Sequence, residues 1–372
     1  MENKYPDWSR RKFITTTAGA GMALMLNPLF ARPKYEADPR VTKIVAKTFG
    51  IDTHNHMDVP FDKMGFAELQ YDLAGEINKS GLSAICMTFC VDRPALKQTG
   101  EAYTRFITSL DEMDDMLKSN NILRALSFSD IRKAHKTKKP IVIQSVEGGH
   151  FIEGKMERIK IAYDRGLRLL GLMHDAQSAL PIGDIYTDKP TFGGMTEYGL
   201  NIVKECNKQG ILVDLAHCSN DAINDALEVS AKPVLISHTG LNTQLGKDER
   251  MAKMMMPRLI GKEQAKIVAD TGGVIGVWTH LADTPLEYAQ NIRALVEVTG
   301  IDHVCIGTDT KIAPPLNAKD RFGKKTNESW QNQSKGFYYS VVEALLKTGF
   351  SEDEIGKIGA GNFLRIFNAA TK

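Results

Sequence analysis

Eight short apolar runs alternate with longer helical segments beyond residue 40 of this 372-residue chain. Each run is almost continuously hydrophobic and is bounded by Gly, Pro, Asn or charged residues, which is typical of parallel strands covered on both faces. The runs are 49–54, 84–90, 141–147, 167–174, 211–217, 233–238, 273–279 and 303–309. Segments such as 196–209 and 261–271 between them carry apolar residues at helical spacing. The pattern predicts an α/β fold, a (β/α)8 barrel of the TIM type.

A doubly wound open sheet is the rival architecture for the same alternation. The first strand is not followed by G-x-G-x-x-G, the phosphate-binding turn of that fold. Polar residues at the ends of most of the runs also favour closure, because the strands of a barrel all end on one face. We therefore expect one closed barrel over residues 49–372.

The N-terminal residues belong to a different kind of segment. The stretch from Ser9 reads S-R-R-K-F-I, and residues 14–30 are uncharged and mostly apolar. Two arginines before a short, weakly apolar run are typical of a twin-arginine export signal. We expect residues 1–31 to be this signal, removed or kept as an anchor and the only membrane contact, and residues 32–48 to be an extension. The protein is then periplasmic or otherwise extracytoplasmic.

Charge and cysteine content narrow the function further. The formal net charge is +2 with both signs interleaved, so there is no basic stripe for nucleic acid. Cys86 and Cys90 lie four residues apart on one predicted strand, roughly 13 Å from each other, which is too far for a disulfide. We expect all five cysteines to be buried free thiols.

Histidines and carboxylates gather where the predicted strands end. The strand ends read I-D-T-H-N-H, Q-S-V-E-G-G-H, L-M-H, V-D-L-A-H, L-I-S-H and I-G-T-D. Residues at these ends converge on one face of a barrel, and so many imidazoles and carboxylates together indicate a metal site. His135, within a basic stretch, is expected at the surface. His280 and His303 carry no companion motif and are expected to lie outside the site.

Two kinds of ligand position can be told apart within this set. His54 and His56 are two apart on a strand and point to the same side, so they can hold one ion. Glu147 can bridge two ions, and His217 with His238 would complete the second.

Several longer motifs resemble the membrane (renal) dipeptidase family of the amidohydrolase superfamily. They are S-V-E-G-G-H at 145–150, G-G-M-T-E-Y-G-L at 193–200, N-K-Q-G-I-L-V-D-L-A-H at 207–217, P-V-L-I-S-H-T at 233–239, P-R-L-I at 257–260, T-G-G-V-I-G-V at 271–277 and I-G-A-G-N-F-L-R at 358–365. The resemblance runs from about residue 51 to the C-terminus. It implies a zinc-dependent dipeptidase with two Zn2+ per chain, in which a metal-bridging hydroxide attacks the peptide bond of a dipeptide.

The resemblance also implies roles for residues around the metals. Glu147 would bridge the ions, and His217 and His238 would bind the second. His174 would polarise the scissile carbonyl, and Asp309 would carry the proton from water to the leaving nitrogen. Arg258 would hold the C-terminal carboxylate of the substrate.

Three departures from the family pattern bear on the site. The first motif is H-x-H at His54–His56 where the family usually has H-x-D, which makes the site one charge less negative. The segment that leads to Arg258 is longer than in the family pattern, so Arg250 is the alternative residue for binding the substrate's carboxylate. The family's acidic and glycine positions after Asp309 are replaced by Thr310, Lys311 and Ile312.

Two other functions remain open at this stage. An amidohydrolase acting on a lactone, phosphoester or N-acyl group would keep the metals but would not need an arginine for a carboxylate. A zinc-binding periplasmic protein without turnover would not need His174 and Asp309. The sequence leaves the oligomeric state open, with a homodimer as one alternative.

Overall fold

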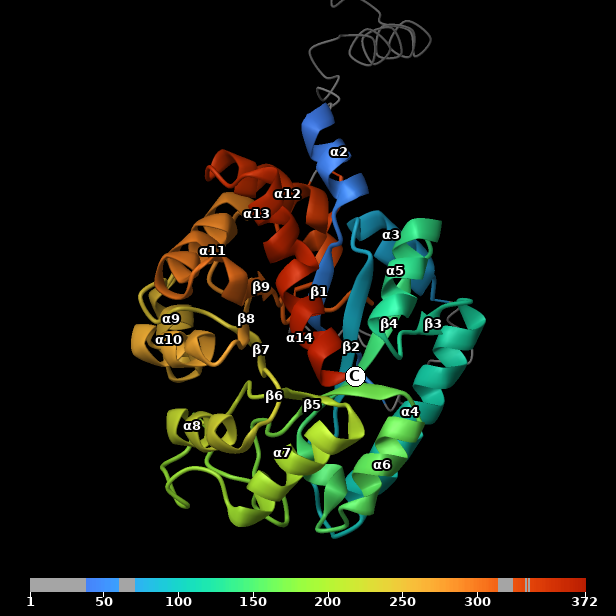
Figure 1. Cartoon of the computed structure of the whole chain (residues 1–372), viewed down its shortest axis with the longest axis vertical. Helices are drawn as coiled ribbons and strands as arrows, with labels where there is room; N and C mark the ends of the chain where they lie inside the picture. The colour runs from blue at the N-terminus through green and yellow to red at the C-terminus, as the bar shows by residue number, and fades with distance from the viewer. Residues whose placement is uncertain (1–37, 60–70, 314–323, 332, 334) are drawn as a thin grey trace, which may run out of the picture. The chain divides into compact units, whose positions relative to one another are not determined.

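A ring of parallel strands surrounded by helices forms the body of the protein (Figure 1). The structure is a computed structural model that describes residues 38–59, 71–313, 324–331, 333 and 335–372. The strands pair in the order β1 (Ile51–His56), β2 (Ala84–Cys90), β4 (Ile141–Glu147), β5 (Leu167–Gly171), β6 (Leu212–Asp214), β7 (Leu235–Thr239), β8 (Val274–Val277) and β9 (Val304–Ile306). A short strand, β3 (Leu123–Arg124), pairs with β4 outside this order.

The two ends of the sheet meet beyond β1 and β9. Asn55 bridges to Thr310 in parallel fashion. The amide of Asp309 donates to the carbonyl of His54 at 3.1 Å, and the amide of His56 donates to the carbonyl of Thr310 at 2.8 Å. These contacts complete a nearly closed ring, so the predicted (β/α)8 barrel is confirmed.

Helices alternate with the strands, and most of them surround the barrel. They are α2 (Pro39–Lys47), α3 (Leu73–Ser80), α4 (Glu101–Ser119), α5 (Phe128–Thr137), α6 (Glu157–Asp164), α7 (Glu197–Gln209), α8 (Asn220–Val229), α9 (Glu249–Met255), α10 (Lys262–Asp270), α11 (Pro285–Thr299), α12 (Phe337–Lys347), α13 (Glu352–Gly356) and α14 (Asn362–Ala370). The bounds of α7 follow from its caps: the Thr196 side chain accepts from the amide of Gly199, and Gly210 ends the helix with φ 82°.

Helix α14 closes one end of the barrel. Its Phe363 and Phe367 are fully buried and belong to one cluster with the first residues of several strands, including Ile51, Leu212 and Val274. Figure 1 shows α14 in the middle of the ring of strands. The amino ends of the strands are therefore sealed by apolar packing, and the opposite end, where the strands finish, is left for polar side chains.

Two predictions about the N-terminus and the cysteines have different outcomes. The predicted export signal, residues 1–31, lies outside the described residues. Helix α2 of the predicted extension buries Val41, Ile44 and Val45 in the core. All five cysteines are free, as predicted, and Cys90 alone among them is only half-buried. None of the helices in the described residues is long and apolar enough to cross a membrane.

Candidate metal centre

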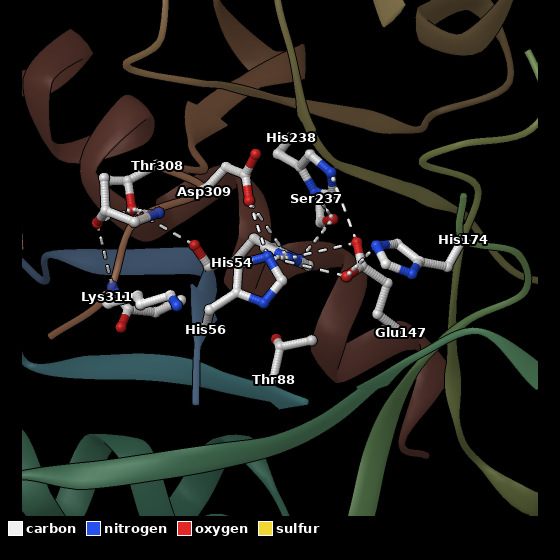
Figure 2. A network of polar contacts seen from close by, with 12 residues as sticks. His54, His56, Thr88, Glu147, His174, Ser237, His238, Thr308, Asp309 and Lys311 are labelled. Carbon is white, nitrogen blue, oxygen red and sulfur yellow. Dashed lines mark hydrogen bonds and ion pairs between the residues drawn. The ribbon is translucent and has the colours of Figure 1, made fainter. Parts of the chain in front are cut away.

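The structure brings seven predicted residues together at the carboxyl ends of the strands. They come from β1, from β4, from β7 and from the segments that follow β5, β6 and β9, and they are His54, His56, Glu147, His174, His217, His238 and Asp309. Figure 2 shows the carboxylate of Glu147 between His174 on one side and His54 with His56 on the other. Residues more than 250 positions apart in the chain thus share one site, as the barrel topology predicts.

One group of donors is formed by β1 and the end of β9. The Nε2 atoms of His54 and His56 lie 3.2 Å apart. Asp309 Oδ1 lies 2.9 Å from His56 Nε2 and 3.9 Å from His54 Nε2. The two histidines project to the same side, as their spacing on a strand predicts.

A second group of donors lies across the barrel mouth. The Nε2 atoms of His217 and His238 lie 3.1 Å apart, and His217 Nε2 lies 2.8 Å from Glu147 Oε1. The His238 ring also tilts against the His54 ring, with centroids 4.0 Å apart. The second group is therefore contiguous with the first.

Glu147 makes close contacts with both groups. Its Oε1 lies 3.5 Å from His54 Nε2, in addition to its contact with His217, and its Oε2 lies 3.8 Å from His56 Nε2. The side chain is 3% exposed. Glu147 is followed by Gly148 at φ 92°, a left-handed conformation that glycine adopts without strain and that turns the chain away from the strand.

Two of the site residues have an unusual backbone conformation. His217 has φ 68° and Asp309 has φ 54°, both in the left-handed region that non-glycine residues seldom occupy. Each follows its strand by three residues, and β6 and β9 are shorter than the apolar runs that predicted them. Strained residues of this kind cluster at functional sites, where surrounding contacts hold them.

The electrostatics of the cluster keep its carboxylates charged. Burial alone would raise the pKa of Glu147, but His174, His54 and His217 around it hold that pKa well below its usual range. Burial likewise opposes ionisation of Asp309, and His238 and His280 hold its pKa well below the ordinary value. Both side chains therefore offer anionic oxygens at neutral pH.

The histidines differ sharply in how they hold protons. Burial lowers the pKa of His54 to about 4 and lowers that of His238 well below its usual range. For His217 the burial cost is outweighed by Glu147 and Asp175, which raise its pKa to about 10. Each close pair of Nε2 atoms thus includes one ring that is neutral and can offer a lone pair.

These donors fit a bound cation. Two pairs of imidazole Nε2 atoms face each other, and Glu147 Oε2 is buried without a hydrogen-bond partner among the described residues. Such an atom is costly unless something satisfies it. Nitrogen donors with carboxylate oxygens are the ligand set of zinc, and the donor groups His54–His56–Asp309 and His54–Glu147–His238 each lie within bonding reach of one ion.

Three acidic or phenolic residues outside the sequence motifs contact the Nδ1 atoms of the site histidines. Asp92 Oδ1 accepts from His174 Nδ1 at 2.6 Å. Asp175 Oδ1 lies 3.3 Å, and the Tyr186 hydroxyl 2.9 Å, from His217 Nδ1. Such contacts orient a ring and direct its Nε2 toward the site. A residue pattern could not single them out, because all three lie in loops beyond the strands.

The remaining histidines depart in part from expectation. His280 lies against the site, with Nε2 2.6 Å from Asp309 Oδ2. It follows β8, whose end carries no histidine-rich motif. His135, expected at the surface, is half-buried. Its ring stacks on Phe49, and its Nδ1 lies 2.9 Å from the Ser83 hydroxyl. His303 contacts the carbonyl of Gly273 and lies apart from the cluster.

Arg258 lies in a pocket beside the second group of donors. The pocket is lined by His217, His238, Tyr186, Arg258 and Trp278, among others. Arg258 ends a short 3-10 turn, η3 (Met256–Arg258), and its carbonyl accepts from Thr239 Oγ1 at 2.8 Å. That contact ties the long segment after β7 back to the strand.

The guanidinium of Arg258 is partly engaged. Its Nη2 donates to Asp175 Oδ2 at 3.1 Å. Arg250, the alternative to Arg258, is exposed on α9 and is not among the described residues that line the pocket. The geometry therefore favours Arg258 as the residue next to the metal ligands.

Comparisons with known proteins place the chain among hydrolases. The family model described as membrane dipeptidase (peptidase family M19) matches residues 39–372. A crystal structure of an amidohydrolase from Pseudomonas aeruginosa superposes with a TM-score of 0.72 at 21% identity, covering 89% of this chain and 98% of that one. The probable dipeptidase PvdM from the same organism gives 0.71 at 17% identity, covering 90% and 99%.

A further solved structure carries a ligand. It is a metallopeptidase from Rhodobacter sphaeroides liganded with a phosphinate mimic of the dipeptide L-Ala-D-Ala, with a TM-score of 0.65 at 16% identity, covering 87% of this chain and 99% of that one. Likeness at such low identity supports the barrel fold.

Proposed function

The chain belongs to the membrane dipeptidase family and is a metal-dependent dipeptidase, and we propose that it works with two Zn2+ ions outside the cytoplasm. The observation that carries the two-metal proposal is the position of Glu147. Its Oε1 atom lies 3.5 Å from His54 Nε2 and 2.8 Å from His217 Nε2. A carboxylate placed between two histidine groups is suited to bridge two ions.

The ligands we propose are the five residues His54, His56, Glu147, His217 and His238. When bound, two zinc ions would polarise the scissile carbonyl and lower the pKa of a water between them, which accounts for a hydroxide nucleophile at neutral pH. The histidine His56, in place of the family's usual carboxylate, adds a neutral nitrogen donor, which suits zinc better than a harder ion.

Asp309 is placed to move the proton in this reaction. Its carboxylate is ionised and lies at the edge of the first donor group, 2.9 Å from His56 Nε2. It can accept a proton from the attacking water and give it to the leaving amine nitrogen, as general base and then general acid.

His174 is placed to stabilise the oxyanion that develops on the carbonyl. It lies between two carboxylates, with Nδ1 2.6 Å from Asp92 and Nε2 3.3 Å from Glu147 Oε2. The Nδ1 contact with Asp92 orients the ring, so that a proton on Nε2 can be donated to the oxyanion.

Arg258 is the proposed site for the substrate's C-terminal carboxylate. It lines the same pocket as His217 and His238, and its Nη2 donates to Asp175. The rest of the guanidinium fork can donate two parallel hydrogen bonds to a carboxylate. The dipeptide mimic in the Rhodobacter sphaeroides relative supports a substrate of this size.

We further propose export by the twin-arginine route, on the strength of Arg10 and Arg11 before an uncharged segment. That route carries folded proteins, so the metals could be loaded before export. The free thiols in the described residues are compatible with this order.

A substrate panel tests the proposed function. Zinc-loaded protein is assayed on free dipeptides, on N-acyl amino acids, on a lactone and on a phosphoester. The proposal predicts hydrolysis of free dipeptides well above the other classes. Hydrolysis of the lactone or phosphoester in preference to every dipeptide would overturn the dipeptidase assignment while leaving the metal site standing.

A further inference from the structure

A third group of possible metal ligands lies beside the centre, on the side away from Asp309. Cys90 ends β2, Asp92 follows it by two residues, and His174 follows β5. One ligand atom from each lies within 4.8 Å of the other two. None of the proposed five ligands of the zinc pair belongs to this group, although His174 faces both.

One buried oxygen atom of this group has no hydrogen-bond partner among the described residues. Asp92 is 3% exposed, yet its Oδ2 has no hydrogen-bond partner among the described residues. Its other oxygen accepts from His174 Nδ1. A buried carboxylate oxygen without a partner is rare and points to a missing ligand.

Cys90 is the partly exposed residue of this group, and its sulfur decides which metals the group prefers. Its thiol is free and only half-buried, whereas the other four cysteines are buried. A thiolate with an imidazole and a carboxylate forms a ligand set for thiophilic divalent ions such as Zn2+, Co2+ or Cd2+, and not for Mg2+ or Ca2+. Arg93, which follows Asp92 in sequence, forms an ion pair with Asp175, so its charge is already engaged.

We propose that Cys90, Asp92 and His174 form a third site for a thiophilic divalent cation, separate from the zinc pair. Binding releases the thiol proton of Cys90 to solvent and places the sulfur on the ion. His174 gives up the Nδ1 proton that it now donates to Asp92, binds the ion through the Nδ1 lone pair and keeps one proton on Nε2. Asp92 contributes a carboxylate oxygen, and no electron transfer is involved.

Occupancy of this site should disturb His174. Nitrogen and oxygen ligands on one tetrahedral zinc lie about 3.3 Å apart, from metal–ligand bonds of ~2.0–2.1 Å. His174 Nδ1 and Asp92 Oδ1 lie 2.6 Å apart now and share a hydrogen bond, and that bond is lost when Nδ1 binds the ion, so the ring loses the contact that orients it. Because the proposed function places His174 at the oxyanion, excess zinc should lower kcat.

Cobalt provides a direct test, because thiolate ligation to Co2+ adds a charge-transfer band in the near ultraviolet. Metal-free protein is titrated with Co2+ while bound metal and the spectrum are recorded. The first two equivalents should give only visible d–d bands, and the charge-transfer band should grow with the third. Cys90→Ser should lose that band and keep two bound ions, whereas Cys206→Ser, a matched buried cysteine on α7, should retain it.

The outcomes separate this proposal from the proposed function. No charge-transfer band at any loading, or a band that persists in Cys90→Ser, overturns the third site and leaves the dipeptidase intact. Fewer than two ions bound in the wild type contradicts the zinc pair instead. In the activity arm, excess Zn2+ should lower kcat of the wild type and of Cys206→Ser but spare Cys90→Ser. Equal inhibition of all three proteins would refute the coupling to His174.

Discussion

His280 and His56 hold opposite oxygens of one carboxylate, that of Asp309. His280 Nε2 lies 2.6 Å from Oδ2, and His56 Nε2 lies 2.9 Å from Oδ1. The side chain that we propose as the proton carrier is therefore fixed between a metal ligand and a histidine outside the ligand set. The left-handed backbone of Asp309, at φ 54°, is held in place by the same contacts.

Replacing His280 should lower turnover more than binding. Loss of a hydrogen bond to a charged group commonly costs about 1.5 to 3 kcal/mol, so His280→Ala should lower kcat roughly ten-fold or more with a small change in KM. Steady-state kinetics and metal analysis would measure both effects. His280→Gln, whose amide can still donate, should recover part of the loss, and His303→Ala should be neutral. A wild-type kcat in His280→Ala would show that the contact is dispensable.

Metal affinity should rise with pH because a proton must leave His217. The pKa of His217 is raised to about 10 in the metal-free protein, so at pH 7 the ring carries an extra proton that an incoming ion displaces. Affinity should therefore increase up to about ten-fold per pH unit between roughly pH 7 and 9. His54, with its pKa lowered to about 4, is already neutral and contributes no such term.

Calorimetry in buffers of different ionisation enthalpy would measure the released protons. We expect at least one proton per chain at neutral pH, and His217→Gln should release fewer, because Asp309 and Glu147 also raise the pKa of His56. Metal binding that releases no proton and is constant over this range would contradict the assignment of His217.

Export depends on the arginine pair in our account. Arg10→Lys with Arg11→Lys should leave the precursor in the cytoplasm, because the twin-arginine signal is read by a receptor and not by hydrophobicity alone. Fractionation of cells would measure this. Arg32→Lys, just beyond the predicted signal, is the matched control and should be exported. Normal periplasmic accumulation of the double variant would rule the signal out.

Arg258 should discriminate free from amidated dipeptides. Arg258→Ala removes a charge-assisted contact worth about 1.5 to 3 kcal/mol, so kcat/KM on free dipeptides should fall roughly ten-fold to a hundred-fold with metal content unchanged. The wild type should cleave C-terminally amidated dipeptides poorly. Arg250→Ala is the control, since that residue lies outside the pocket lining. Equal cleavage of free and amidated dipeptides by the wild type would exclude a carboxylate clamp at this site.

The barrel and the cluster of metal-binding side chains could be predicted because strand periodicity and strand order decide them. The strands Ala84–Cys90 and Ile141–Glu147 coincide with the predicted runs, since the second is buried along its full length and the first is buried up to its last residue. The run at 211–217 overshoots its strand, which ends at Asp214, because the left-handed His217 leaves the sheet. Apolar composition alone does not reveal such a turn.

The residues that support the site were not predictable in the same way. Asp92 and Asp175 lie in loops whose paths depend on tertiary packing, and His280 follows a strand without other titratable residues at its end. Their partners are 82, 83 and 29 positions away in the chain, respectively. Distances in sequence carry no information on such pairs, so only the folded structure identifies them.

The central claim is that Glu147 joins two zinc ions on which peptide hydrolysis depends. The most direct measurement titrates metal-free wild type and Glu147→Gln with Zn2+ while bound zinc and kcat/KM on a free dipeptide are followed together. The account predicts that wild-type activity rises to a plateau at about two bound ions and that Glu147→Gln fails to retain either ion and is inactive. Full activity of the metal-free wild type, or loss of only one ion in Glu147→Gln, would contradict it.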